Sequence, residues 1–208
     1  MKARSRELLL KAMLRELGEK GREGIEPARV LPACMVSAEE FTAEFADVDA
    51  CLDAAYDELS AQIATEVQVG CKNGGSSSAG SRSWPSRVRA GLDALLGTLA
   101  DDPPMAHILI RTFPSLGGEA RRRYQAFTER FVPLLAEGRE HSGVAEELPS
   151  GVELLAIGAA EAIIFEEVAS GRAEQLPELG PSILFSLLVP FLGPISAAAE
   201  MEKAQQRR

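Results

Sequence analysis

The stretch that decides the fold covers residues 36–59 and reads VSAEEFTAEFADVDACLDAAYDEL. Ser37 is followed three residues later by Glu40, the spacing of a capping box, in which both side chains satisfy free backbone N–H groups at the start of a helix. Phe41 and Phe45 then recur at helical spacing, which predicts a helix that ends near Phe45. The stretch therefore begins with a short, capped helix that buries two aromatic rings.

A longer helix with a single apolar face is predicted to follow, from about residue 48 to residue 69. Its apolar residues recur every three or four positions: Val48, Leu52, Tyr56, Leu59, Ile63 and Val67. Residues 4–18 have the same period, with an apolar face made of Leu10, Met13, Leu14 and Leu17. Pro27 suits the first position of a further short helix, which Pro32 disturbs. These predictions give four helices within the first 70 residues.

The rest of the chain is predicted to form a second set of helices. Residues 71–83 are rich in glycine and serine, which predicts a flexible loop. The apolar period then predicts helices at about 84–100, 105–113, 118–141, 151–170 and 177–192. Because hydrophobic residues make up 46% of the chain, aromatics only 5%, and alternating β-branched runs are few, we expect an all-α protein.

A cytoplasmic protein without a membrane segment is expected. The longest strongly apolar stretch, residues 183–195, is shorter than the roughly 20 residues that a membrane-spanning helix needs. The basic N-terminus is followed by an amphipathic segment that lacks the apolar core of a leader peptide.

Residues 30–71 contain no Lys, Arg or His, and we call this stretch without positive charge the charge void. It carries nine carboxylates, at Glu39, Glu40, Glu44, Asp47, Asp49, Asp53, Asp57, Glu58 and Glu66. Residues 1–70 hold 8 basic and 14 acidic side chains, against 14 and 17 in residues 71–208. This balance has the wrong sign for a nucleic-acid binder, whose sequence-independent affinity comes from Lys and Arg at phosphates.

The order of residues resembles the TetR family of one-component regulators. The resemblance rests on residues 6–12, on Val36-Ser37 with Phe41 and Phe45, on residues 45–58, and downstream on residues 84–92 and 134–139. It implies an all-α homodimer of about nine helices that binds operator DNA and a small apolar ligand. The implied organisation is a helix-turn-helix head at 1–47, a connector helix at 48–70, a loop at 71–83, and a ligand-binding and dimerisation domain at 84–208.

The resemblance also implies which residues of the head face DNA: Lys2, Arg4, Arg6, Arg29, Ser37, Ala38, Glu39, Glu40 and Thr42. The head departs from the family pattern at Met35, where a glycine is common, and at three acidic positions that include Glu44. A carboxylate can accept a hydrogen bond from cytosine, but several without a neighbouring cation oppose phosphate contacts. A solvated terminus is the alternative interpretation of the N-terminal cations.

A ligand site and a dimer surface are predicted in the second half of the chain. Aromatic and polar residues typical of an apolar pocket are His107, Ile110, Phe113, Tyr124, Phe127, Phe131 and Glu161. Small and large apolar residues on the last two helices predict a symmetric helical interface made by Gly158, Ala162, Leu184, Leu187, Leu188 and Phe191. Core packing within one subunit is the alternative for both sets. The run Arg121-Arg122-Arg123 indicates an exposed helix start rather than a nucleic-acid patch.

Motifs of catalysis are missing from the sequence. It has two histidines, no nucleophile elbow and no phosphate loop, and the spacing of Cys34, Cys51 and Cys71 matches no zinc or redox motif. We therefore expect no enzyme, no metal and no cofactor, and reduced, partly buried cysteines. Two functions stay open: a ligand-responsive repressor, or a TetR-like dimer whose head does not bind DNA and serves as a ligand-binding or interaction module.

Overall fold

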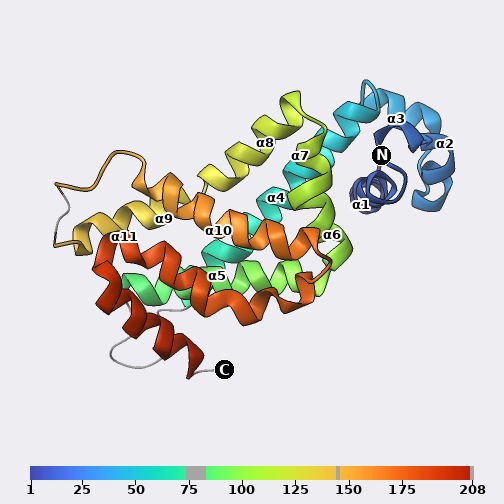
Figure 1. Ribbon diagram of the computed structural model, residues 1–208. Helices are drawn as coiled ribbons and strands as arrows, with labels where there is room; N and C mark the ends of the chain where they lie inside the picture. The colour runs from blue at the N-terminus through green and yellow to red at the C-terminus, as the bar shows by residue number, and fades with distance from the viewer. Residues whose placement is uncertain (74–82, 144–145, 207–208) are drawn as a thin grey trace. The chain divides into compact units, whose positions relative to one another are not determined.

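The computed structural model describes residues 1–73, 83–143 and 146–206, and within these residues it contains helices and no strand (Figure 1). The expected all-α class is confirmed. The chain divides into two compact units that alternate along the sequence. Unit 1 comprises Met1–Gln62 and Pro104–Tyr124, and unit 2 comprises Ile63–Pro103 and Gln125–Arg208. The domain boundaries expected at residues 47, 70 and 83 divide the chain in sequence order, whereas each compact unit combines two separate segments of the chain.

Unit 1 opens with the predicted small helices. They are α1 (Ala3–Lys20), the 3-10 turn η1 (Arg22–Gly24), α2 (Pro27–Val30), the 3-10 turn η2 (Leu31–Cys34), α3 (Ala38–Glu44) and the first half of α4 (Val48–Asn73). The capping box is confirmed, since Ser37 Oγ accepts from the Glu40 N–H at 3.1 Å and a Glu40 carboxylate oxygen accepts from the Ser37 N–H at 3.0 Å. The predicted apolar face of α1 is buried, with every member at most 3% exposed.

The turn between α2 and α3 contains a left-handed residue. Met35 has φ 56° and ψ 43°, and it is the one non-glycine residue with positive φ in the described part of the chain. Its side chain is 72% exposed and packs little. The Val36 N–H donates to Leu31 O across the turn, at 3.1 Å. Because the left-handed conformation costs a residue with a Cβ roughly 1–2 kcal/mol, the glycine that is common here in the TetR family would fit better.

The second segment of unit 1 is helical but irregular. It contains α6 (Pro103–His107), a π-helical turn η3 (Ile108–Thr112), α7 (Phe113–Ser115) and the start of α8 (Gly118–Glu129). The helix predicted over about 105–113 is present, but a π-helical turn interrupts its α-helical geometry. Pro114 cannot donate the backbone hydrogen bond that a regular helix would direct to Ile110 O, and the chain widens one turn before it.

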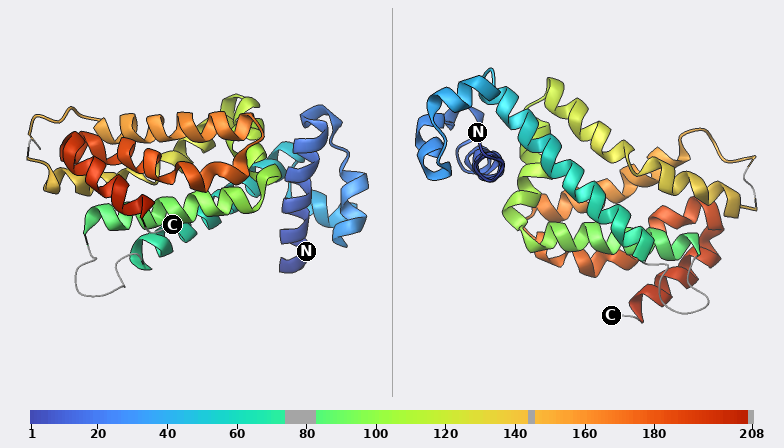
Figure 2. Two further views of the ribbon diagram at one scale, coloured as in Figure 1. Left: turned by 60° about the horizontal axis from the view of Figure 1, so that its bottom comes forward. Right: turned by 180° about the vertical axis from the view of Figure 1, so that it is seen from behind.

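Unit 2 is built around α11 (Leu176–Gln205), which packs against α5 (Trp84–Asp101) and α10 (Val152–Ala169) (Figure 2). Its other described elements are the second half of α4, the end of α8, α9 (Val132–Ala136), the 3-10 turn η4 (Glu137–His141) and the 3-10 turn η5 (Ala173–Gln175). The predicted loop at 71–83 lies mostly outside the described residues, which end at Asn73 and resume at Ser83.

Two predicted helices of unit 2 differ from the observed ones. A continuous helix over 118–141 was expected, but α8 ends at Glu129. Pro133 has no N–H to donate to the Glu129 carbonyl, as the residue at this position would in a continuous helix. The last helix was expected to end at Leu192, but helical structure continues to Gln205 beyond a kink at Gly193, whose φ is 72°. Glycine adopts this angle without a steric cost.

Trp84 and Gly138 pack tightly in the core of unit 2. The indole is 1% exposed, its Nε1–H donates to Leu134 O at 2.7 Å, and its ring meets Phe191 edge-on with centroids 5.4 Å apart. A Cβ on Gly138 would lie 2.5 Å from Trp84 Cζ2, closer than packed carbon atoms come. Glycine is thus required where η4 crosses this ring.

Among the described residues, one helical segment, Ala173–Gln205, has the length and apolar composition of a membrane-spanning helix. Part of its apolar surface serves the core of unit 2, where Leu184, Leu188 and Phe191 are at most 2% exposed and the helix packs against α5 and α10. Only 33% of its most apolar window is buried, and Ile195 is 86% exposed.

Candidate nucleic-acid interface and ligand site

The outward face of α3 is neutral to acidic. Phe41 and Phe45 point into the core of the head, 7% and 5% exposed, so that Ala38, Glu39 and Thr42 lie on the exposed side. The Thr42 hydroxyl donates back to Ala38 O at 3.0 Å, within its own helix. The pKa of the exposed Glu40 carboxyl is lowered, chiefly because the Ser37 backbone N–H donates to it. Glu40 therefore serves the cap, and Glu39 is the α3 carboxylate that extends from the outward face.

The cations predicted to contact phosphate fall into two groups. Arg6 is half-buried, with Nε 2.6 Å from a Glu44 carboxylate oxygen and a second ion pair to Glu58, so it joins α1 to α3 and α4. Arg29 pairs with Glu26 at 2.7 Å, but both side chains are more than half exposed, and such pairs contribute little. Lys2 and Arg4 are exposed at the N-terminus. Lys2 and Arg4 near the N-terminus, together with the weakly paired Arg29, are therefore the accessible cations of this predicted set.

Carboxylates of the charge void bind arginines from distant parts of unit 1. Arg6 lies 38 residues before Glu44 and 52 before Glu58. Arg22 pairs with Asp49, which lowers the pKa of that carboxyl through their hydrogen bond. The void has no cation that could neutralise these groups within their own helix. Glu44, Asp49 and Glu58 therefore serve the tertiary structure, a role that the sequence analysis missed.

A third arginine contacts the middle of α4. Arg123 on α8 pairs with Asp57 and lies 3.4 Å from an Asp53 carboxylate oxygen. Burial raises the pKa of Asp53, and the nearby Arg123 opposes that rise without cancelling it. The sequence signal that could have revealed this contact is the spacing of Asp49, Asp53 and Asp57, which places them on one face of α4. Arg123 was expected at an exposed helix start and is instead half-buried.

The predicted ligand residues divide between the two units. In unit 1, Phe113 is fully buried and stacks on Tyr56 with centroids 4.0 Å apart, and Ile110 is 7% exposed. His107 and Tyr124 are half-buried, and His107 Nδ1 lies 3.1 Å from the Thr112 hydroxyl across the π-helical turn. Core packing therefore accounts for Phe113, whereas the two polar residues keep part of their surface accessible.

In unit 2, the predicted ligand residues are two aromatics and one acid. Phe127 is 3% exposed and meets the half-buried Phe131 edge-on, with centroids 5.4 Å apart. Glu161 is half-buried on α10. The structure thus brings together the two phenylalanines of this subset.

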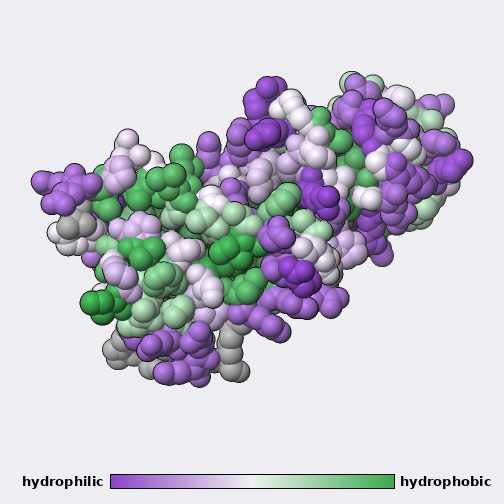
Figure 3. Space-filling model, viewed as in Figure 1, coloured by the Kyte–Doolittle hydropathy of each residue, from purple (hydrophilic) through white to green (hydrophobic). Residues whose placement is uncertain are grey.

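The residues predicted for the dimer interface also divide into two groups. Leu184, Leu187, Leu188 and Phe191 lie in the core of unit 2, at most 8% exposed, whereas Gly158 and Ala162 are exposed on α10. The exposed side of α10 is nevertheless apolar, and we name it the α10 face: Leu154, Leu155, Gly158, Ala159, Ala162 and Phe165. Figure 3 shows apolar residues gathered over the part of unit 2 that contains α10 and α11, while the head is mainly polar.

Metal-binding and reactive groups are not apparent in the part of the chain that the structure describes. No group of three or more His, Cys, Asp or Glu residues is placed to hold a metal ion within this part. All three cysteines are free; Cys34 and Cys51 are buried and Cys71 is half-buried. Burial raises the pKa of Cys51 to about 12, so its thiol stays protonated and unreactive at neutral pH.

Comparisons with known proteins show a shared fold. Two solved structures are similar over most of their length. The fatty acid degradation regulator FadR from Bacillus halodurans superposes with a TM-score of 0.72 at 14% identity, covering 87% of this chain and 96% of that one. The transcriptional regulator FadR from Bacillus subtilis, in complex with stearoyl-CoA, gives 0.61 at 15% identity, covering 89% and 97%. No protein-family profile matches the chain. No curated protein matches it by sequence.

Proposed function

We propose that this chain is a TetR-like, ligand-responsive transcriptional regulator of the cytoplasm that acts as a repressor. One observation carries the proposal: the short α2, a left-handed turn at Met35 and the Ser37-capped α3 form a helix-turn-helix arrangement in unit 1. The shared fold with two regulators along nearly the whole chain supports it. In this proposal residues 1–47 form the DNA-binding head and α4 connects it to the helices that follow.

DNA contact in the proposed regulator depends on few charges. Ala38, Glu39 and Thr42 on the exposed side of α3 would face base edges, where Glu39 can accept from the amino group of cytosine. Lys2 and Arg4 would neutralise phosphates. Arg6 would stay with Glu44 and Glu58, because leaving them would expose two acids to the DNA backbone. Binding should therefore be specific rather than strong, and favoured at low salt.

The proposed ligand is a small molecule with an apolar part. Within unit 1, the half-buried polar side chains of His107 and Tyr124 are able to contact it; within unit 2, Phe131 and Glu161 form a separate candidate set. The Bacillus subtilis neighbour was solved with stearoyl-CoA, which makes a long acyl chain a suitable probe. Stearoyl-CoA and stearate, titrated separately, distinguish recognition of the acyl chain from recognition of the nucleotide.

The proposed regulator is a homodimer that buries the α10 face against a second copy. Leu155 is 69% exposed, Leu154 48% and Phe165 44%, an apolar content that monomers rarely present to water. The small residues Gly158 and Ala162 between them permit close approach of two helices. A symmetric contact of this kind would place one head on each half of a palindromic site.

A second function is favoured by the acidic surface of the head. If the two accessible arm cations are too few, the protein would be a dimer whose head does not bind DNA and whose helical units serve as a ligand-binding or interaction module. The observation behind this alternative is the charge void: α3 lies within it, and its outward face exposes Glu39 but no cation.

One experiment separates the two functions. The intact chain is incubated with a pool of random-sequence duplexes at low and at moderate salt, and the bound DNA is sequenced. Enrichment of a palindrome supports the regulator. Absence of any enriched sequence, even at low salt, contradicts it and favours the interaction module. A variant with Lys2→Ala and Arg4→Ala is the control for binding through the arm.

A further inference from the structure

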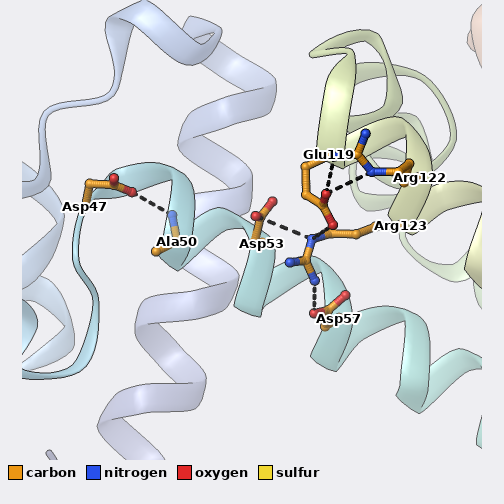
Figure 4. A network of polar contacts seen from close by, with 7 residues as sticks. All are labelled: Asp47, Ala50, Asp53, Asp57, Glu119, Arg122 and Arg123. Carbon is orange, nitrogen blue, oxygen red and sulfur yellow. Dashed lines mark hydrogen bonds and ion pairs between the residues drawn. The ribbon is translucent and has the colours of Figure 1, made fainter.

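The two chain segments of unit 1 are joined by a polar contact at the start of α8. Figure 4 shows Arg123 extending from α8 between Asp53 and Asp57 of α4, two carboxylates that lie one helical turn apart. The side chains of Arg123 and Asp53 are 26% and 27% exposed and that of Asp57 is 50% exposed, so the contact is partly shielded from water on the Asp53 side. A planar guanidinium can serve two carboxylates at once, which an ammonium group cannot do with the same geometry.

The neighbouring arginine makes a different contact. Arg122 donates to Glu119 at 2.5 and 3.0 Å, three residues earlier on the same helix. Arg123 Nε also lies 3.7 Å from Glu119, so that acid borders both arginines. Arg122 is 69% exposed and pairs with Glu119 within α8, whereas Arg123 reaches α4. The two residues are thus matched in charge and position but differ in what they connect.

Apolar contacts hold the rest of residues 104–124 against the head. The Phe113 ring stacks on Tyr56 of α4. The Ile108 side chain lies against Gly18 of α1, where a Cβ would come within 2.7 Å of it. Arg123 is the polar contact nearest to residue 124, at which α8 leaves unit 1 and continues as part of unit 2.

We propose that Arg123 is a positioning residue that clasps α8 to α4, so that the head and residues 104–124 open and close as one cooperative body. This inference deepens the proposed function and takes its regulatory meaning from it. Tyr124 and Phe127, both predicted ligand residues, follow Arg123 on the same helix. A ligand that displaces this part of α8 would therefore act on α4, and through α4 on the head, by way of Arg123.

The clasp is tested by native-state hydrogen exchange on the intact chain, without DNA or ligand. Arg123→Gln should raise exchange of amides in residues 48–60 and in residues 104–120 together, by up to about fivefold, the range for ion pairs with a half-exposed partner such as Asp57. Asp57→Asn should have a similar effect, and the double variant should exchange no faster than either single one. Arg123→Lys should restore part of the protection. Arg122→Gln should leave exchange in α4 unchanged.

Two results would overturn the inference. One is a rise in exchange that stays within α8 when Arg123 is replaced. The other is full additivity of the Arg123→Gln and Asp57→Asn effects, which would mean that the two side chains do not act through each other. The outcome does not depend on the DNA selection: a failed selection removes the regulatory meaning of the clasp, whereas local or additive exchange removes the clasp itself.

Discussion

At the scale of single residues, Met35 and Gly138 each occupy a position whose backbone or packing restricts the side chain. Met35 has a left-handed backbone with an exposed side chain, and Gly138 lies against an indole ring with no room for a methyl group. The first is a residue that fits its position poorly, and the second is a residue that the position demands. Substitutions at the two should therefore change stability in opposite directions.

Met35→Gly should stabilise unit 1. It removes a left-handed strain of roughly 1–2 kcal/mol, and the extra chain entropy of glycine offsets about 0.5–1 kcal/mol of this, which leaves a gain of up to about 1.5 kcal/mol. The opening free energy of α1 and α3 amides in native-state hydrogen exchange measures it. Ala33→Gly, an exposed site in η2 without positive φ, is the matched control and should lose stability. A loss at Met35→Gly as large as that of the control would contradict the strain.

Gly138→Ala should destabilise unit 2 by roughly 1–3 kcal/mol, because the new methyl group overlaps the Trp84 ring and must displace it. Urea unfolding followed by the fluorescence of Trp84, the single tryptophan of the chain, reports on this unit. Gly97→Ala on α5 provides the control, since no atom lies within 4 Å of its Cβ and the helix should gain about 0.5–1 kcal/mol. Equal free energies of unfolding for the two variants would show that η4 shifts to accommodate the methyl group, which would contradict the prediction.

At the scale of elements, regular helices were predictable and their interruptions were only partly so. The apolar faces of α1 and α4 and the capping box of α3 follow from short-range spacing, which a sequence displays directly. Pro114 and Pro133 were visible as well, but the widened turn at η3 and the end of α8 depend on which carbonyl each proline leaves without a donor. The partners of the charge void lie up to 70 residues away, at Arg123 for Asp53, and no local pattern reveals such pairs.

The start of α10 should lose stability in acid. Arg139 donates to the buried Glu153 carboxylate at 2.5 Å and to Pro149 O at 2.9 Å, and its ion pair lowers the pKa of Glu153. Because the folded pKa lies below the unfolded one, this contribution is complete above the unfolded pKa, whose ordinary value is 4.5, and is lost as pH falls through the lower folded value.

Chemical unfolding between about pH 6 and pH 3, followed by Trp84 fluorescence, checks this dependence. Glu153→Gln should be less stable than the wild type at pH 6 and should show a smaller decline toward pH 3, because its pair is already broken. Glu147→Gln, at an exposed site, should follow the wild type. If the free energy of unfolding of Glu153→Gln fell toward pH 3 as steeply as that of the wild type, other carboxylates would cause the loss of stability.

At the scale of the whole molecule, the two interleaved units are connected by helices that belong to both. α4 and α8 each begin in unit 1 and end in unit 2, so a change in one unit has a helical route into the other. The α10 face of unit 2 is the surface that we assign to a second copy. Its apolar residues are exposed in a single chain, whereas a stable monomer rarely exposes an apolar surface of this kind to water.

Leu155→Glu should convert the dimer into a monomer without unfolding it, because Leu155 is 69% exposed within one chain and a charge there is costly only when a partner covers it. Sedimentation at micromolar concentration should give the dimer for the wild type and 22.3 kDa for the variant. Ile195→Glu, at a site 86% exposed beyond the Gly193 kink, should remain dimeric. A wild type of 22.3 kDa would refute the proposed interface.

The most direct test of the proposed regulator is its affinity for the duplex enriched from the random pool, measured against salt from about 50 to 200 mM. If Lys2 and Arg4 of each subunit make the phosphate contacts, we predict measurable binding at the low end and a slope of log K against log salt of about −4 or shallower. Replacing both cations with alanine should flatten that slope. No enriched duplex and no binding at the lowest salt would contradict a DNA-binding head.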